Sequence, residues 1–179
     1  MNLFKTDFTF DAGKIAEELT SRTFVPHNMK AWEENGNSAL LLITTNGEEN
    51  HDYEEPMLPT ADLLDMPYTR SIWEQLDIPL LRSRIMRIAP HGMNQPHFDT
   101  GVWWKGKHRV HIPVQTNERC TFLCGGELVH MAAGSCWVVN TRLYKHAAFN
   151  QSDEYRTHLV IDIFDEDLNK LGENYDLAR

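Results

Sequence analysis

The stretch RVHIPVQTNERCTFLCGGELVHMAAGSCWVVN, residues 109–140, contains the pattern that decides the fold. Short runs rich in β-branched and apolar residues alternate with turn signals, of which Gly125-Gly126 and Ala133-Gly134 are the clearest. Short strands at this regular spacing are typical of a sandwich or barrel, not of alternating strands and helices. The residues therefore predict a mainly β protein.

The same texture extends outward from this stretch in both directions. A turn at Pro90-His91-Gly92 separates a candidate strand at 84–89 from a short one near 95–99. We expect about eight strands in a barrel. The further candidate strands are 109–115, 120–124, 127–131, 136–140, 146–149 and 157–163.

The first third of the chain has a different pattern, which predicts helices as well as a strand. Asp11 is a good N-cap for a short helix that runs to about residue 21, and residues 68–77 have the apolar spacing of a second helix. Residues 39–44 (ALLLIT) predict a strand. Residues 48–67 are acidic and contain three prolines, so we expect a long surface loop there.

Length and composition fit one globular domain. The chain has 179 residues, 41% of them hydrophobic and 24% charged, which is ordinary for a soluble domain with its own core. We expect a single domain over residues 1–179. Its parts are a helical and mixed support at 1–83, the β core at 84–164 and a C-terminal tail at 165–179.

The net charge of −9 disfavours two classes of partner, nucleic acid and anionic membrane. The N-terminal residues lack the order of a secretory signal, and no apolar run is long enough to cross a bilayer, so we expect a cytoplasmic protein. The three cysteines are expected to be small buried side chains without a disulfide.

His97 and Asp99 are the first candidate metal ligands. In an extended strand, residues two apart share a face, so both side chains point the same way. His146 begins a later candidate strand. Two imidazoles and one carboxylate on one side of an ion leave its other side open, as in non-haem Fe(II) oxygenases.

Two candidate strands each carry an arginine followed two residues later by a histidine. These are Arg109 with His111, and Arg156 with His158. An arginine in a strand that is meant to be buried is costly unless it meets an anion. A dicarboxylate that chelates a metal at one end would need such a cation at the other. An ion pair of Arg156 with Asp153 or Glu154 at an edge is the alternative.

In combination these motifs resemble the aspartyl/asparaginyl β-hydroxylase family of 2-oxoglutarate dioxygenases. The matching text is RIMRIAPHGMNQPHFDTG, HRVHIPVQTN and GGELVHMAAGSCWVVNTRLYKHAAFNQSDEYRTHLVIDI, between residues 84 and 163. The resemblance implies a double-stranded β-helix (jelly-roll, cupin-like) core. It further implies Fe(II) on His97, Asp99 and His146, and 2-oxoglutarate held by Arg156 with Arg109 and His111.

The resemblance also implies the reaction, which is hydroxylation of a C–H bond with O₂ as oxidant, release of succinate and CO₂, and ascorbate as a useful addition in vitro. Asp99 sets the chain apart from the animal peptidyl-aspartate enzymes, which lack that carboxylate, and makes it similar to a bacterial branch that includes free-proline hydroxylases. A free amino acid or a small derivative is the expected substrate, with an Asp or Asn side chain in a peptide as the alternative.

Two other functions remain open at this point. One is a cupin-like protein that binds a metal or carboxylate, or senses it, without turnover. The other is a zinc hydrolase, which would leave Arg156 without a task. The sequence specifies no oligomeric state.

Several residues near the motifs have two interpretations each. Trp103 and Trp104 form either a substrate lid or ordinary packing, and residues 48–65 form either a lid or a solvated loop. His158 is expected to be a satisfied core histidine, with contact to the co-substrate as the alternative. Arg84 and Arg87 are expected on the surface, with contact of one of them to a substrate carboxylate as the alternative.

Overall fold

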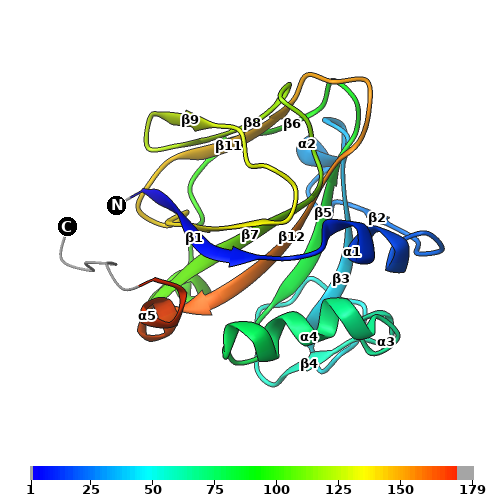
Figure 1. Ribbon diagram of the computed structural model, residues 1–179, viewed down its shortest axis with the longest axis vertical. Coiled ribbons are helices and arrows are strands. Elements are labelled where there is room, and N and C mark those ends of the chain that lie inside the picture. The colour runs from blue at the N-terminus through cyan, green and yellow to red at the C-terminus, as the bar shows by residue number, and fades with distance from the viewer. Residues whose placement is uncertain (1, 173–179) are drawn as a thin grey trace.

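Two antiparallel sheets face each other in the structure, a computed structural model that describes residues 2–172 (Figure 1). The larger sheet has the strand order β1-β10-β7-β12-β5-β3-β2, with β4 paired to β3, and the smaller has the order β6-β11-β8-β9. The mainly β, jelly-roll prediction is confirmed.

The strands of the larger sheet are β1 (Leu3–Thr9), β2 (Val25–Pro26), β3 (Asn37–Thr45), β4 (Met57–Pro59), β5 (Ser83–Ile88), β7 (Lys107–Gln115), β10 (Ser135–Val139) and β12 (Arg156–Phe164). Those of the smaller sheet are β6 (Met93–His97), β8 (Cys120–Cys124), β9 (Glu127–Val129) and β11 (His146–Asn150). The helices are α1 (Ala12–Glu18), α2 (Lys30–Glu33), α3 (Ala61–Leu64), α4 (Pro67–Leu76) and α5 (Leu168–Leu171), with 3₁₀ turns η1 (Val102–Trp104) and η2 (Asp165–Asp167).

The two faces of the larger sheet have different tasks. Ile85, Leu159 and Ile112 lie opposite one another on β5, β12 and β7, and they pack against helices α1, α3 and α4 in the main core. In the next row, Arg84, Val160 and His111 lie opposite one another. Because neighbouring residues on a strand point to opposite faces, this second row points towards the smaller sheet. The space between the sheets therefore receives polar side chains such as Arg84 and His111 among apolar ones.

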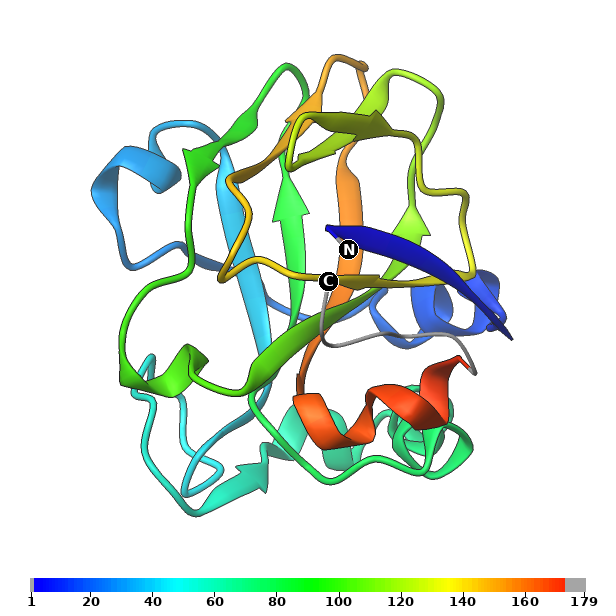
Figure 2. The same cartoon turned by 90° about the vertical axis from the view of Figure 1, so that its left-hand side faces the viewer.

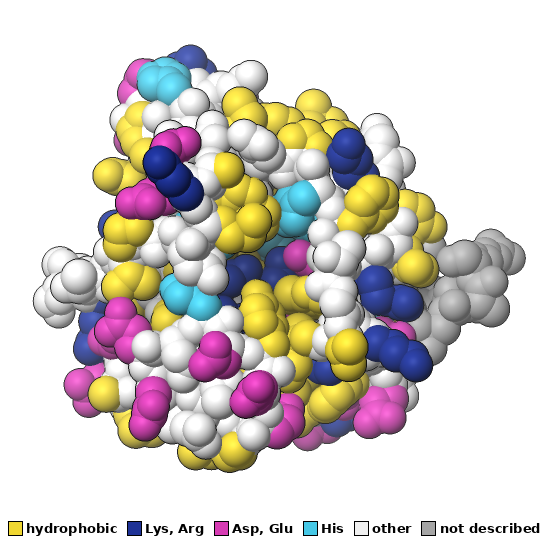
Figure 3. All heavy atoms as spheres, turned by 180° about the vertical axis from the view of Figure 1, so that it is seen from behind, with side chains coloured by type: hydrophobic (Ala, Val, Ile, Leu, Met, Phe, Trp, Pro, Cys, Tyr) yellow, Lys and Arg dark blue, Asp and Glu magenta, His cyan; other side chains and the backbone are white. Residues whose placement is uncertain are grey.

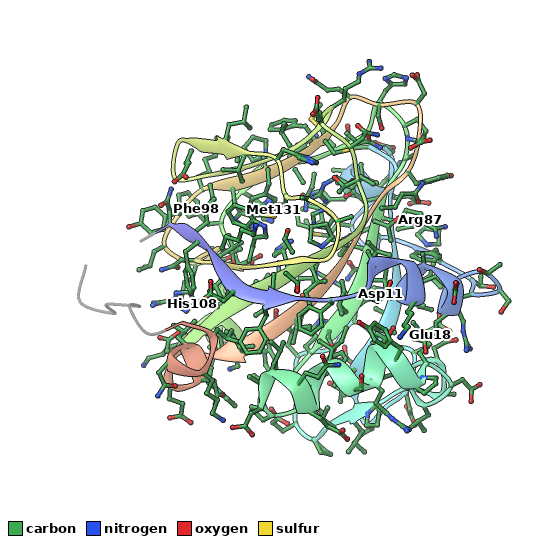
Figure 4. The ribbon with its side chains drawn as sticks, viewed as in Figure 1. Asp11, Glu18, Arg87, Phe98, His108 and Met131 are labelled. Carbon is green, nitrogen blue, oxygen red and sulfur yellow. The ribbon has the colours of Figure 1, made fainter. Side chains whose placement is uncertain are left out.

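Helices α1, α3 and α4 lie on the side of the larger sheet away from the smaller one, whereas α2 lies beside β3 and β6 (Figures 1 and 2). Asp11 caps α1 as expected, because its carboxylate accepts from the N–H of Lys14. Helix α4 has no side-chain cap of its own, and the carboxylate of Glu18 on α1 accepts from the N–H groups of Tyr68 and Thr69 instead (Figure 4). This contact joins the two helices.

Three expectations about the flanking regions need correction. Residues 3–9 form strand β1, which pairs with β10 and was not predicted, so the N-terminal third supplies more of the larger sheet than the predicted strand at 39–44. This edge strand has charged Lys5 and Asp7 on its outer side and shows little alternation of apolar and polar residues. The sequence pattern therefore did not predict a strand here. The expected loop at 48–67 contains β4 and α3.

The expected C-terminal tail begins as ordered structure. Residues 165–171 form η2 and α5, in which Leu168 and Leu171 are buried. The rest of the expected tail, 173–179, lies outside the described residues. No helix among the described residues has the length and apolarity to cross a bilayer. The three cysteines are free and buried, as expected.

Candidate metal centre and its anion pocket

His97, Asp99 and His146 converge at one end of the space between the sheets. His97 is the last residue of β6 and His146 the first of β11, and the register of the two strands sets them directly opposite each other. Asp99 follows two residues later, its N–H donating to the carbonyl of Thr141 at 3.0 Å. One ligand atom from each of the three residues lies within 4.8 Å of the others.

The two imidazoles are oriented with their lone pairs towards this point. His97 Nδ1 is 2.6 Å from the carbonyl oxygen of Gln95, and His146 Nδ1 is 3.4 Å from that of Tyr144. Because a carbonyl oxygen only accepts, each Nδ1 carries the proton and each Nε2 keeps its lone pair. Each Nε2 lies 3.8 Å from an oxygen of Asp99.

The charges at this end suit a cation. Burial lowers the pKa of His97 and lowers that of His146 to about 4, so both rings are neutral at pH 7. Burial alone would raise the pKa of Asp99, but Arg109 and His146 outweigh it and the pKa is lowered. Two neutral imidazoles and one carboxylate are a donor set that a divalent transition metal accepts.

Arg109 lies between two buried carboxylates. Its Nε donates to Asp162 Oδ1 at 3.1 Å, and its Nη1 is 2.9 Å from Asp99 Oδ2 as an ion-pair contact without good hydrogen-bond alignment. The indole N–H of Trp103 donates to the other oxygen of Asp162 at 2.9 Å, and the ring of Trp104 lies 4.1 Å from the guanidinium. We expected Arg109 to contact the co-substrate. In the structure it lines the pocket, but its positive charge is already paired with the carboxylates of Asp99 and Asp162.

Arg156 has the opposite surroundings. Its side chain is 3% exposed, and no carboxylate of residues 2–172 lies within ion-pair distance. Its hydrogen-bond partner is Nδ1 of His158 at 3.3 Å, and burial lowers the pKa of Arg156 to about 10. Since the guanidinium donates, Nδ1 of His158 accepts, and the buried Nε2–H of His158 is left without a partner. His158 is therefore not the fully satisfied core histidine we expected.

A pocket joins these two ends. Figure 3 shows the hollow from outside, with Lys or Arg side chains on its floor and His side chains around it. A buried donor group without a partner costs free energy, which an anion bound here would recover. The lining residues are Asn37, Arg84, Met86, Ile88, Asn94, Arg109, His111, Phe122, His146, Ala148, Arg156 and Val160.

Arg84 is a lining residue that we wrongly expected on the surface. It is 6% exposed and lies on the cavity face of β5, whereas Arg87 points the other way and stacks over Phe24 at 3.5 Å. The alternation Arg82, Arg84, Met86 was the signal in the sequence that assigns Arg84 to the inner face.

The sequence also did not predict an aromatic wall beside the metal centre, which is formed by Trp32 and His27 of the N-terminal third. The Trp32 ring lies 4.6 Å from the His97 ring and 4.5 Å from the His27 ring. Tyr53 lies 5.8 Å from both Trp103 and Trp104, so the acidic loop and the tryptophan pair meet at the mouth. No short motif identifies these contacts, because they join segments far apart in the chain.

The barrel with two histidines and one carboxylate at its mouth defines a class of jelly-roll metal-site proteins. Within this class, residues 15–166 match the aspartyl/asparaginyl beta-hydroxylase family, and the chain belongs to that family. The suspected resemblance is thereby confirmed.

A curated relative is the L-proline cis-4-hydroxylase of Rhizobium meliloti (strain 1021), which is 26% identical over 166 residues. The match covers 86% of this chain and 57% of the relative, so the chain spans little more than half of that protein's length.

Two solved structures have a similar fold. A prolyl hydroxylase from Trichoplax adhaerens, in complex with a hypoxia inducible factor peptide fragment, aligns with TM-score 0.61 at 9% identity over 98% of this chain and 88% of that chain. A 2OG-Fe(II) oxygenase family oxidoreductase from Burkholderia pseudomallei aligns with TM-score 0.55 at 13% identity over 85% of this chain and 77% of that chain. These likenesses concern the fold.

Proposed function

We propose that the chain is an Fe(II)- and 2-oxoglutarate-dependent hydroxylase acting on a C–H bond of an amino acid or an amino-acid-derived compound. The observation that carries this proposal is one cavity with two complementary ends. At one end, the lone pairs of His97 and His146 meet the carboxylate of Asp99. At the other end, the cation of Arg156 has no carboxylate partner among the described residues.

His97, Asp99 and His146 would hold the metal, and the backbone carbonyls behind the two histidines would fix the ring tautomers. With 2-oxoglutarate and O₂, bound Fe(II) supplies the oxidant for hydroxylation, with succinate and CO₂ as products. The salt bridge from Arg109 to Asp99 Oδ2 would leave Oδ1 free for the metal. Asp162 supports that arrangement by holding the guanidinium from the other side.

Arg156 would bind the far carboxylate of 2-oxoglutarate. Its guanidinium and the free Nε2–H of His158 are both buried donors, which suits a carboxylate better than any neutral group. His111 is buried on the neighbouring strand and lines the same pocket, consistent with contact to the co-substrate between its two ends. A zinc hydrolase would leave Arg156 and His158 without a ligand.

The amino-acid substrate is supported by the relationship to the L-proline cis-4-hydroxylase, with a peptide side chain as the alternative. Trp103 and Trp104 would act through their neighbours: Trp103 binds Asp162, and Trp104 covers Arg109. Both tryptophans are then part of the wall of the substrate mouth.

The test is succinate formation from 2-oxoglutarate under air, with Fe(II) and ascorbate, across free amino acids and short Asp, Asn and Pro peptides. We expect one class of compound to stimulate turnover, and His146→Ala to lower it at least about a hundred-fold through loss of metal. His91→Ala is the matched control, since His91 is an exposed histidine paired with Asp153. Tight Mn(II) and 2-oxoglutarate binding without succinate from any compound would favour the non-catalytic binding protein.

A further inference from the structure

Asn150 is a buried carboxamide at the end of β11 that is remote from the metal centre. It is 1% exposed, and its two N–H groups face three backbone carbonyls. These are the carbonyls of Ile88 at 3.1 Å, Ala89 at 3.0 Å and Glu154 at 2.7 Å. Its oxygen accepts from the backbone N–H of Ser152 at 3.1 Å and from the Ser152 hydroxyl at 2.7 Å. Donors on one side and acceptors on the other fix the orientation of this amide.

These contacts converge on the backbone of Arg156. Ile88 is opposite Arg156 in the pairing of β5 with β12, and Glu154 precedes Arg156 by two residues. One carboxamide therefore holds both the strand beside Arg156 and the turn that leads into it. On the other side, the pairing of β12 with β7 begins at Thr157 and has a register shift before His158. Within the described residues, Arg156 itself is thus paired with β5 alone.

The guanidinium of Arg156 has little else to hold it in place. Arg109 is fixed by two carboxylates, whereas the side chain of Arg156 has a single hydrogen bond among the described residues, at 3.3 Å to Nδ1 of His158. A paired fit of guanidinium and carboxylate depends on the placement of both planar groups. The backbone at the start of β12 must therefore supply the placement that no acidic partner provides.

Cys120 on β8 extends the network around Asn150. The two residues are opposite each other in the pairing of β11 with β8, and Cys120 is 2% exposed. The shortest hydrogen-bond contact of its thiol is to the side-chain oxygen of Asn150 at 3.3 Å, and Sγ is 3.8 Å from Oγ of Ser152. The smaller sheet is therefore connected through Asn150 to the strand and the turn beside Arg156.

We propose that Asn150 is a positioning residue for the co-substrate: supported by Ser152 and Cys120, it holds Arg156 where Arg156 binds the far carboxylate of 2-oxoglutarate. This inference rests on the proposed function, and it adds residues that act through Arg156. None of the three is among the residues that line the cavity. Their effect should therefore concern the far carboxylate and not the metal.

The experiment compares two ligands of the full chain loaded with Mn(II). One is 2-oxoglutarate, and the other is oxalate, which chelates the metal but has no far carboxylate. Calorimetric titration measures both dissociation constants. Asn150→Ala is expected to weaken 2-oxoglutarate binding at least about 5-fold, because Arg156 loses its alignment, and to leave oxalate binding within about 2-fold of wild type. A purely structural role would change both affinities by the same factor.

Milder variants keep the inference testable if Asn150→Ala does not fold. Cys120→Ala removes a donor to Asn150, whereas Cys120→Ser keeps one, so we expect a 2-oxoglutarate affinity about 2- to 10-fold weaker in the first variant and near wild type in the second. Ser152→Ala should resemble Cys120→Ala. Thr60→Ala is the matched control. It removes a buried hydroxyl that caps α3 through Leu63, and it should lower the free energy of unfolding without changing either affinity.

The outcomes separate this inference from the proposed function. An Asn150→Ala protein that binds 2-oxoglutarate as wild type does, or that loses oxalate and 2-oxoglutarate equally, would overturn the positioning role alone. If that variant does not fold, normal 2-oxoglutarate binding by both Ser152→Ala and Cys120→Ala would do the same. A wild-type protein that binds Mn(II) but not 2-oxoglutarate would overturn the proposed function, and the positioning role with it.

Discussion

Arg109 and Arg156 lie on neighbouring strands, β7 and β12, and line the same cavity, but their surroundings differ. Arg109 contacts both Asp99 and Asp162, and these carboxylates outweigh burial and raise its pKa. Arg156 has no such partner among residues 2–172, and burial lowers its pKa to about 10. Both side chains are almost fully buried, so exposure does not explain the contrast.

The difference teaches how to read a buried arginine. A buried cation between two carboxylates is already compensated, and its removal disturbs the groups that it holds. A buried cation without a partner carries a desolvation cost that a bound anion recovers. By this criterion Arg109 positions Asp99, while Arg156 and Arg84 are available for ligands.

The largest change in stability is expected from removing a carboxylate that pairs with Arg109. Asp162→Ala removes a buried carboxylate that accepts from both Arg109 and Trp103. Arg109 keeps Asp99, but its Nε–H and the indole N–H of Trp103 lose their acceptor, at about 1–3 kcal/mol for each buried donor, which chemical denaturation would measure as a lower free energy of unfolding. Asp153→Asn is the control, because its ion pairs with His91 and Arg119 are exposed and should contribute under about 1 kcal/mol. Equal losses in the two variants would refute the distinction.

The next largest effect is expected from Arg156, the arginine without a carboxylate partner among the described residues. Arg156→Met should weaken 2-oxoglutarate binding about 10- to 150-fold, the effect of one lost charged hydrogen bond, and should leave the free energy of unfolding unchanged or higher. Calorimetric titration of 2-oxoglutarate into the Mn(II)-loaded protein measures the first quantity, and urea denaturation the second. A variant that is strongly destabilised but binds 2-oxoglutarate normally would assign Arg156 a structural role instead.

The smallest effect is expected from pH. In the folded protein the pKa of His27 is lowered to about 3 by burial and by Arg84, His51, Arg82 and Arg109, whereas the unfolded chain has the ordinary value near 6.5. Between these values the unfolded state binds a proton that the folded state does not, so stability falls as pH falls from 6.5 towards 3.

His27→Asn should therefore lose less stability than wild type between pH 7 and pH 5, as measured by urea denaturation at both values. The remaining loss is expected from the other histidines whose pKa values burial lowers, among them His111, His146 and His158. An identical pH dependence in variant and wild type would show that His27 takes up its proton in the folded state.

The strand-rich half was largely predictable, because short apolar runs between turn residues have few other structures open to them. The spacing of His97 and Asp99 and the presence of Arg156 in an apolar strand were also visible as patterns. The edge strand β1 was not predictable in this way, because its stability comes from backbone pairing with β10 and not from an apolar face.

Sequence alone also misjudged Arg84 and passed over His27. Both are charged or polar residues whose ordinary location is the surface, and their burial depends on which face of the sheet the second sheet covers. The pairing of Arg109 with Asp162 is likewise a contact across two strands, which the register of β7 and β12 fixes.

The sequence by itself determined the β class, the candidate ligand set and the presence of buried arginines, because periodicity and residue type are local properties. Only the tertiary structure decided which arginine is paired and which is free, since that depends on distances between strands far apart in the chain. The same holds for Arg84, which the pairing of β5 with β3 and β12 places on the wall of the cavity.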